Sequence, residues 1–165
     1  MTISATALTG FNAADAADAA RDVARCCGST AFAAAIVAGR PYADLGELSA
    51  AIDDAFGRLG WADVAEALAG HPRIGERAAA GWSRGEQAGA LAAPERVARD
   101  LAEGNRIYEE RFGHVFLVCA SGLSGEQMLA MLRARLANDP ATERTVVTDE
   151  LRKITQLRMR KLLSG

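Results

Sequence analysis

The chain contains 165 residues, half of them apolar, and carries a formal net charge of −2. This length and apolar fraction predict one globular domain over residues 1–165 with a substantial core. The near balance of charge gives no field to attract nucleic acid or an anionic membrane, and no apolar run reaches the roughly 18 residues of a membrane span. Neither nucleic acid nor a membrane is therefore expected as a partner.

The N-terminus and the cysteines bear on where the protein works. The N-terminal segment lacks the basic start and apolar centre of a secretory signal. The three cysteines are Cys26, Cys27 and Cys119, and an odd count with two adjacent members does not make a disulfide framework. A reducing cytoplasm is the expected compartment.

In chain order, segments rich in alanine and leucine alternate with glycine and proline, which predicts helices separated by short breaks. Asn12 is expected to cap the first helix, Ser29 or Thr30 the second, Asp44 the third and Ser124 the seventh. The predicted helices span residues 12–27, 29–39, 44–59, 62–70, 83–91, 94–111, 124–138 and 140–163. The sequence thus predicts an all-α fold, a single-domain bundle of about eight helices.

One apolar run, VFLVCASG at residues 115–122, could be a buried strand or an extended loop. If it is buried and extended, its peptide groups need partners. A planar ligand rich in amide and carbonyl groups could supply some of them. Cys119, within this run, is expected to be a buried thiol rather than a nucleophile.

His71 is the first candidate for chemistry, because it stands before Pro72 in a glycine-rich break. Proline disfavours a helical conformation for the residue before it, so His71 should leave the preceding helix and project from its axis. An unperturbed imidazole titrates near pH ~6.5 and can exchange protons at neutral pH. A capping or surface histidine remains an alternative.

A polar turn follows in the sequence SRGEQAG. Ser83, Glu86 and Gln87 have i, i+3 and i+4 spacing, which places them on one face of a helix. Ser83 and Glu86 also fit a capping box, in which each would bond the other's backbone N–H. The cap does not require Gln87. A helix cap and a ligand site use the same groups, so both interpretations stay open.

Arg158 falls on an apolar stripe of the last predicted helix, together with Leu151, Ile154 and Leu162. A buried arginine needs a carboxylate or an anionic ligand, whereas an arginine that extends past the core into water does not. The spacing alone does not decide whether Arg158 is buried with a partner or extends into water. With two histidines and no His-Glu-x-x-His or Cys-x-x-Cys pattern, no metal site is expected.

Four motifs in this order resemble the family of 2-oxo-4-hydroxy-4-carboxy-5-ureidoimidazoline (OHCU) decarboxylases. They are HPRIGE, SxxEQAG, NxxYxxRFGxxFxxCxSG and ELxKIxxLRxxxL, and the similarity runs from about Phe11 to Leu163. Each motif is modest alone, but four at suitable spacing are specific.

The resemblance implies an all-α homodimer without a cofactor that converts a small-molecule substrate, OHCU, into (S)-allantoin, the last step of urate degradation. It implies that His71 is the catalytic acid and base and that Glu86 is its polar partner. The positions that match substrate contacts in the family are Pro72, Ser83, Gln87, Phe116, Leu117, Val118, Cys119, Ala120 and Arg158. Two alternatives remain: a non-catalytic helical ligand-binding module, and a lyase or hydrolase that acts on a related ureide.

Overall fold

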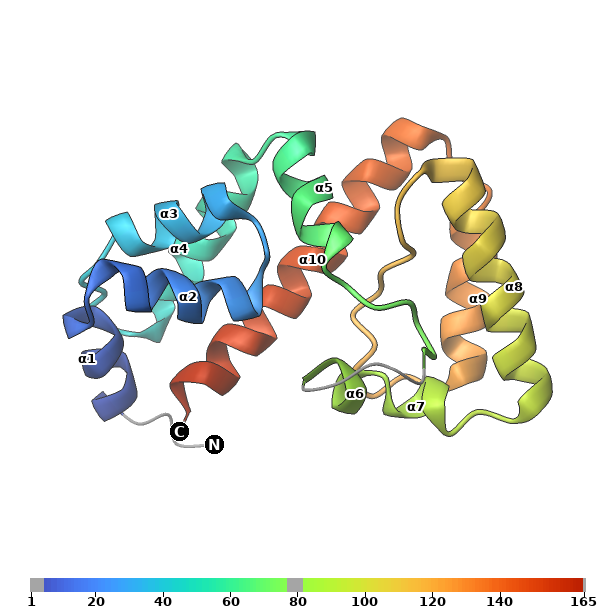
Figure 1. Ribbon diagram of the computed structural model, residues 1–165, viewed down its shortest axis with the longest axis horizontal. Coiled ribbons are helices and arrows are strands. Elements are labelled where there is room, and N and C mark those ends of the chain that lie inside the picture. Colours follow the sequence, from blue (N-terminus) through green and yellow to red (C-terminus); the bar gives the residue numbers. More distant parts are fainter. Residues whose placement is uncertain (1–4, 77–81, 165) are drawn as a thin grey trace. The chain divides into compact units, whose positions relative to one another are not determined.

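The computed structural model describes residues 5–76 and 82–164, which form helices joined by loops (Figure 1). The helices in this part of the chain are α1 (Ala5–Ala13), α2 (Ala16–Cys26), α3 (Thr30–Ala38), α4 (Leu45–Arg58), α5 (Trp61–Ala69), α6 (Trp82–Glu86), α7 (Ala88–Leu91), α8 (Glu95–Phe112), α9 (Gly125–Arg135) and α10 (Pro140–Leu163). The predicted all-α fold is confirmed. Across the described residues, no helix combines the length and the hydropathy needed to cross a membrane.

Side-chain caps fix several of the predicted helix starts. The side chain of Ser29 accepts the backbone N–H of Phe32, and that of Asp44 accepts the backbone N–H of Glu47. Ser124 forms a full capping box with Gln127 at the start of α9. These bonds satisfy N–H groups that have no partner inside the helix, so the sequence locates these starts correctly.

The prediction for the first helix is wrong. Asn12 lies inside α1, and the cap of α2 is Asp15, whose side chain accepts the N–H of Ala17. The Asn12 amide instead bonds both backbone groups of Tyr42, donating to its carbonyl and accepting from its N–H. This partner is 30 residues away, so local pattern gives no sign of it.

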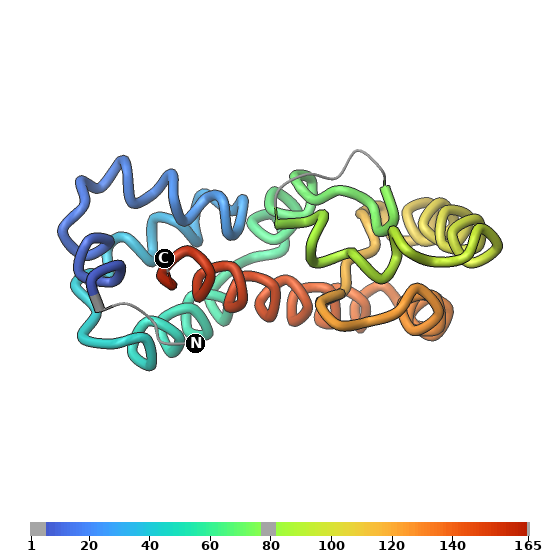
Figure 2. The backbone as a smooth tube through the Cα atoms, turned by 90° about the horizontal axis from the view of Figure 1, so that it is seen from below, coloured from blue at the N-terminus to red at the C-terminus, as the bar shows by residue number. Residues whose placement is uncertain are grey.

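The chain divides into two compact units. Unit 1 comprises residues 1–67 and 152–165, and unit 2 comprises residues 68–151. The division falls within α10, which Figure 2 shows as one uninterrupted helix. That residues 1–165 form a single domain stays a prediction.

In unit 1, α3 packs against both α2 and α4. The rings of Phe32 and Phe56 lie 5.1 Å apart between α3 and α4. The buried side chains of these three helices include Ala19, Val23, Phe32, Ile36, Leu48, Ile52 and Phe56.

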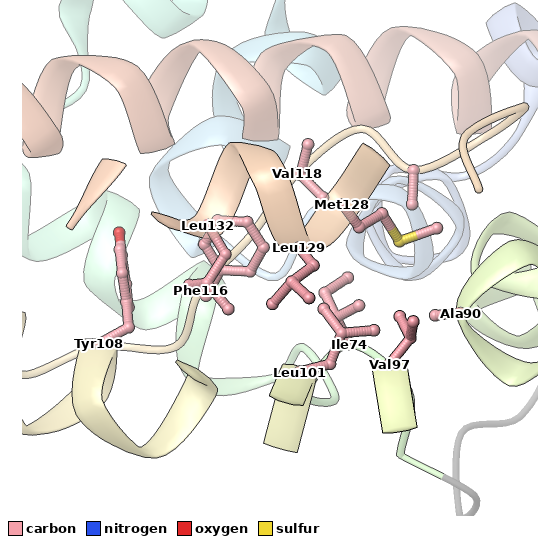
Figure 3. Packing of buried hydrophobic residues seen from close by; sticks show 11 residues of the cluster. Ile74, Ala90, Val97, Leu101, Tyr108, Phe116, Val118, Met128, Leu129 and Leu132 are labelled. Atoms are coloured by element: carbon pink, nitrogen blue, oxygen red, sulfur yellow. The ribbon is translucent and has the colours of Figure 1, made fainter. Parts of the chain in front are cut away.

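In unit 2, α8 packs along α9, and α7 also contacts α9. The side chains of Leu101, Met128 and Leu132 are fully buried between them, as the close view in Figure 3 shows. Two glycines permit this packing, because a Cβ on Gly104 would collide with Leu132 and a Cβ on Gly89 would collide with the backbone carbonyl of Leu123. α7, which directly follows Gln87, is thereby fixed against the start of α9.

Candidate active site

His71 lies where the sequence places it, in the loop after α5. This helix ends at Ala69, and the backbone N–H of His71 donates to the carbonyl of Leu68 to close its last turn. The side chain is half-buried. We call residues 71–76, which carry the motif HPRIGE, the His71 loop.

Three contacts hold the His71 loop within unit 2. The side-chain amide of Asn105, on α8, donates to the carbonyl oxygen of Ile74 at 3.1 Å. The N–H of Gly75 donates to Oε1 of Gln87 at 3.0 Å. The guanidinium of Arg73 makes a two-pronged ion pair with Glu109 on α8.

The predicted helix over residues 83–91 is wrong, because the structure has two short helices, α6 and α7, that meet at Gln87. α6 begins at Trp82, so Ser83 is its second residue rather than its cap. Glu86, its last residue, comes two positions later than a capping box requires. Glu86 and Gln87 are both buried, and Ser83 is half-buried. The capping-box interpretation of Ser83 and Glu86 therefore loses its geometric basis.

Residues 115–120 are an extended loop rather than a strand, and Phe116, Leu117, Val118 and Ala120 are buried. The prediction of a buried thiol at Cys119 is wrong, because this residue is only half-buried. Two side chains satisfy peptide groups of this loop. Arg135, on α9, donates to the carbonyl of Leu117, and Glu150, on α10, accepts the N–H of Cys119 at 3.4 Å. The protein's own side chains therefore supply some of the hydrogen-bond partners that the peptide groups of this apolar run were expected to need.

A buried ionic network lies behind this loop. Glu143 is fully buried and accepts hydrogen bonds from the Tyr108 hydroxyl, from Nε of Arg135 and from the Asn138 amide. Burial is the main cause that raises the pKa of Tyr108, and its bond to Glu143 adds to the effect. Because Arg135 joins both Glu143 and the carbonyl of Leu117, the network fixes the path of the extended loop.

Arg158 is buried at 8% exposure, on the same stripe of α10 as Leu151 and Ile154. This disfavours an arginine whose guanidinium extends into water. Within unit 1, burial raises the pKa values of Cys26 and Cys27, and the positive charge of Arg158 opposes part of this rise. All the other candidate residues belong to unit 2.

A cavity of about 670 Å³ lies elsewhere, in unit 1 between α4 and the C-terminal part of α10. None of the candidate residues lines it, and its walls are mainly apolar. Within residues 5–76 and 82–164, no group of three or more histidine, cysteine, aspartate or glutamate side chains is placed to hold a metal ion.

Sequence reasoning missed the residues that support the candidate site. It did not predict Asn105, Arg135, Glu143 or Glu150 as members of the site. Asn105 did carry a usable signal, since an amide on the apolar face of a helix needs a buried partner. The other three carry the same kind of signal, because they lie at helical spacing from buried apolar residues: Arg135 follows Met128 and Leu132 on α9, and Glu143 and Glu150 flank Val147 on α10.

The fold and these motifs can be compared with known proteins. Residues 12–160 match the family model of OHCU decarboxylases. The chain is 37% identical over 140 residues to a 2-oxo-4-hydroxy-4-carboxy-5-ureidoimidazoline decarboxylase of Amia calva, covering 79% of each sequence. It is also 36% identical over 147 residues to a uric acid degradation bifunctional protein of Arabidopsis thaliana, covering 84% of this chain but only 45% of that protein.

Solved structures agree with these relatives. A crystal structure of an OHCU decarboxylase in the presence of (S)-allantoin matches with a TM-score of 0.76 at 32% identity, over 86% of this chain and 96% of that one. A crystal structure of an (S)-allantoin synthase matches with a TM-score of 0.72 at 16% identity, over 94% of this chain and 54% of that one, which supports the fold alone. Since the family model spans most of the sequence and a relative above 30% identity is covered over more than two thirds of its length, the chain belongs to the OHCU decarboxylase family.

Proposed function

We propose that the protein is a carboxy-lyase that decarboxylates OHCU to (S)-allantoin in urate degradation. The family match is the general support for this activity. The observation that carries it at the site is the bond between Gly75 of the His71 loop and Gln87, which directly follows Glu86. This bond joins the two backbone segments that hold the proposed reacting residues.

The chemistry suits a protein without a cofactor. The substrate carries a hydroxyl and a carboxylate on one ring carbon, next to a conjugated C=N bond. When the bond to the carboxylate breaks and CO₂ leaves, its electron pair can pass into the C=N bond. A proton is then added to the neighbouring carbon and another to the nitrogen, while the hydroxyl gives up its proton and becomes a carbonyl. The protein must orient the carboxylate out of the ring plane, stabilise the developing negative charge and deliver the proton to one face.

His71 is proposed to transfer the proton, a role commonly worth ~10²–10⁴-fold in rate. Glu86 is proposed as its polar partner, which orients the imidazole or polarises the substrate. The burial of Glu86 supports this role, because water screens the charge of a buried carboxylate less than that of an exposed one. Delivery from a fixed imidazole to one face accounts for a single product configuration.

The remaining residues are proposed as substrate contacts. Pro72, Ser83 and Gln87 would line one side of the ligand, and the extended loop from Phe116 to Ala120 would form a backbone wall. Oε1 of Gln87 already accepts from Gly75, so a bond from Gln87 to the substrate would use its amide nitrogen.

Arg158 is proposed to hold a carbonyl or ureido oxygen, or to pair only loosely with the carboxylate. A tight ion pair with the departing carboxylate would stabilise the ground state and slow the reaction. Arg158→Lys should therefore weaken substrate binding, because lysine lacks the planar donor fork of arginine.

Three further features belong to this proposal. The working form is a homodimer, as the family resemblance implies, and no cofactor takes part. A cytoplasmic location is proposed from the three cysteines, which do not form a disulfide framework.

The test generates the unstable substrate in place, from urate with urate oxidase and hydroxyisourate hydrolase, and follows optical activity. The wild-type chain should accelerate the reaction and give a chiral excess of (S)-allantoin. His71→Asn should keep the helical circular dichroism spectrum and lose most of the turnover, by ~10²-fold or more. Absence of both acceleration and chiral excess with the wild-type chain would favour a ligand-binding module or an enzyme for another ureide.

A further inference from the structure

We propose that Asn105 and Gln87 are positioning residues that together hold the Ile74–Gly75 peptide and so fix the place of His71. The inference rests on the proposed role of His71 in the reaction. It gives the side-chain oxygen of Gln87 a positioning role and leaves the amide nitrogen for the substrate. It also includes Asn105 in the site.

The two hydrogen bonds meet on one peptide unit. Asn105 donates to the carbonyl of Ile74 at 3.1 Å, and Gln87 accepts the next N–H, that of Gly75, at 3.0 Å. In a trans peptide the C=O and the N–H point to opposite sides. The peptide plane is therefore held at both edges, which prevents its rotation as well as its displacement.

The surroundings make this peptide depend on its two amide partners. Asn105 is 2% exposed and Gln87 5% exposed, so water does not readily replace either side chain. Gly75 has φ = +81°, a left-handed conformation that glycine adopts easily. The side chain of Ile74 also holds the loop, because it packs in the buried core of unit 2 among Ala90, Val97 and Leu101 (Figure 3).

Asn105 shows a feature that stability alone does not explain. Its Oδ1 is buried and has no hydrogen-bond partner among the described residues. Turning the amide round would set this oxygen against the carbonyl oxygen of Ile74, so the donor must face the loop. An apolar side chain at position 105 would avoid this unpaired acceptor. The presence of an amide is therefore best explained by the hydrogen bond from its nitrogen to the carbonyl of Ile74.

The geometry also links the two proposed reacting residues. His71 is three residues before Ile74, and Glu86 directly precedes Gln87. The hydrogen bond from Gly75 to Gln87 thus connects the loop that carries His71 to the residue next to Glu86. Displacement of a reacting group by about 1 Å can reduce the rate roughly 100-fold.

The first experiment needs no substrate. Amide hydrogen exchange of Gly75 is measured by NMR in the wild-type chain, Gln87→Met and Gln87→Glu. Gln87→Met removes the acceptor and should reduce protection on the order of tenfold, whereas Gln87→Glu keeps an oxygen opposite the N–H and should retain protection. Gln156→Met is the matched control, because Gln156 bonds Ser49 and Asp53 in unit 1. Equal protection of Gly75 in the wild-type chain and Gln87→Met would overturn the proposal.

The second experiment uses the decarboxylation assay. Asn105→Leu and Asn105→Asp both remove the donor to Ile74, one with an apolar and one with an isosteric side chain. Each variant should lower kcat roughly 10–100-fold while KM changes little, because His71 is misplaced and the substrate contacts remain. An unchanged kcat in Asn105→Leu, with a native circular dichroism spectrum, would remove Asn105 from the site.

The two experiments separate this inference from the proposed function. If the wild-type chain does not accelerate decarboxylation but Gly75 exchange depends on Gln87 as expected, the peptide is held and the proposed activity is wrong. If the wild-type chain is active but neither Gly75 exchange nor kcat responds to these variants, the activity stands and the positioning role is wrong.

Discussion

Glu86 is the residue at which a structural and a chemical role can be separated most directly. It is buried at the end of α6, and Ser83 is not placed to form a capping box with it. If Glu86 acts on His71, Glu86→Gln removes a charge without changing size and should lower kcat.

The same variant should move the pH–rate limb assigned to His71 to lower pH, because a nearby carboxylate favours the imidazolium form. The measurement is the profile of kcat from pH 5 to 9, and Glu103→Gln, which removes an exposed carboxylate paired with Arg106, is the control. Wild-type turnover with an unmoved limb would leave His71 acting without Glu86.

Cys26 gives a second prediction at this scale, on alkaline stability. Burial raises the pKa of this fully buried thiol from 9.0 to about 12, and the charge of Arg158 opposes part of the rise. The folded chain keeps a proton that the unfolded chain releases above pH 9. The thiol's contribution is therefore complete below pH 9 and is lost as the pH rises towards 12, at about 1.4 kcal/mol per pH unit.

Cys26→Ala should remove this contribution. The free energy of unfolding, measured with urea under reducing conditions, should fall less steeply in the variant than in the wild-type chain between pH 9 and 10.5. Parallel curves for the two proteins would mean that the Cys26 thiol does not titrate differently on unfolding.

At the scale of single elements, the contact of α7 with the start of α9 depends on Gly89. A Cβ at this position would collide with the backbone carbonyl of Leu123, which cannot rotate away as a side chain would. Gly89→Ala should destabilise the fold by roughly 1–3 kcal/mol, which lowers Tm by about 2–10 °C for a chain of this size.

The control for this change is Gly85→Ala in the neighbouring helix α6, where an added Cβ meets nothing within 4 Å. That variant should be neutral or slightly stabilising, since alanine favours helix more than glycine does. Both are measured by thermal unfolding. Equal Tm values for the two variants would show that α7 can shift without cost.

Helix starts and ends were the most predictable features, because their causes are local. Ser29, Asp44 and Ser124 each cap a helix by accepting the backbone N–H three residues later, and Gly113 ends α8 with φ = +79°. The break at Gln87 was not predictable in this way. Its side chain bonds Gly75, 12 residues earlier, a partner that the pattern within residues 83–91 does not reveal.

The candidate site shows the same boundary between local and distant causes. The exit of His71 from its helix follows from Pro72 and is confirmed. The extended course of residues 115–120 depends on Arg135 and Glu150, which come later in the sequence and on different helices. Periodicity within the apolar run could not reveal side chains that come from outside it.

For the whole molecule, the family resemblance predicts a homodimer. Sedimentation equilibrium at micromolar concentration should give a mass of about twice the 17.3 kDa of the chain. A mass of one chain would limit the functional unit to a single copy. The assay described for OHCU, repeated across the same concentrations, would then show whether turnover per chain depends on assembly.

The division of α10 between the two units has a consequence for synthesis on the ribosome. Unit 2 is one continuous stretch and has all its residues once Leu151 has been made, whereas unit 1 receives its last segment only when residues 152–163 follow. The first four helices are thus translated about 100 residues before the segment that completes their unit. Nascent chains halted after Leu151 should therefore contain every residue of the unit that carries His71 while the N-terminal helices still await their final partner.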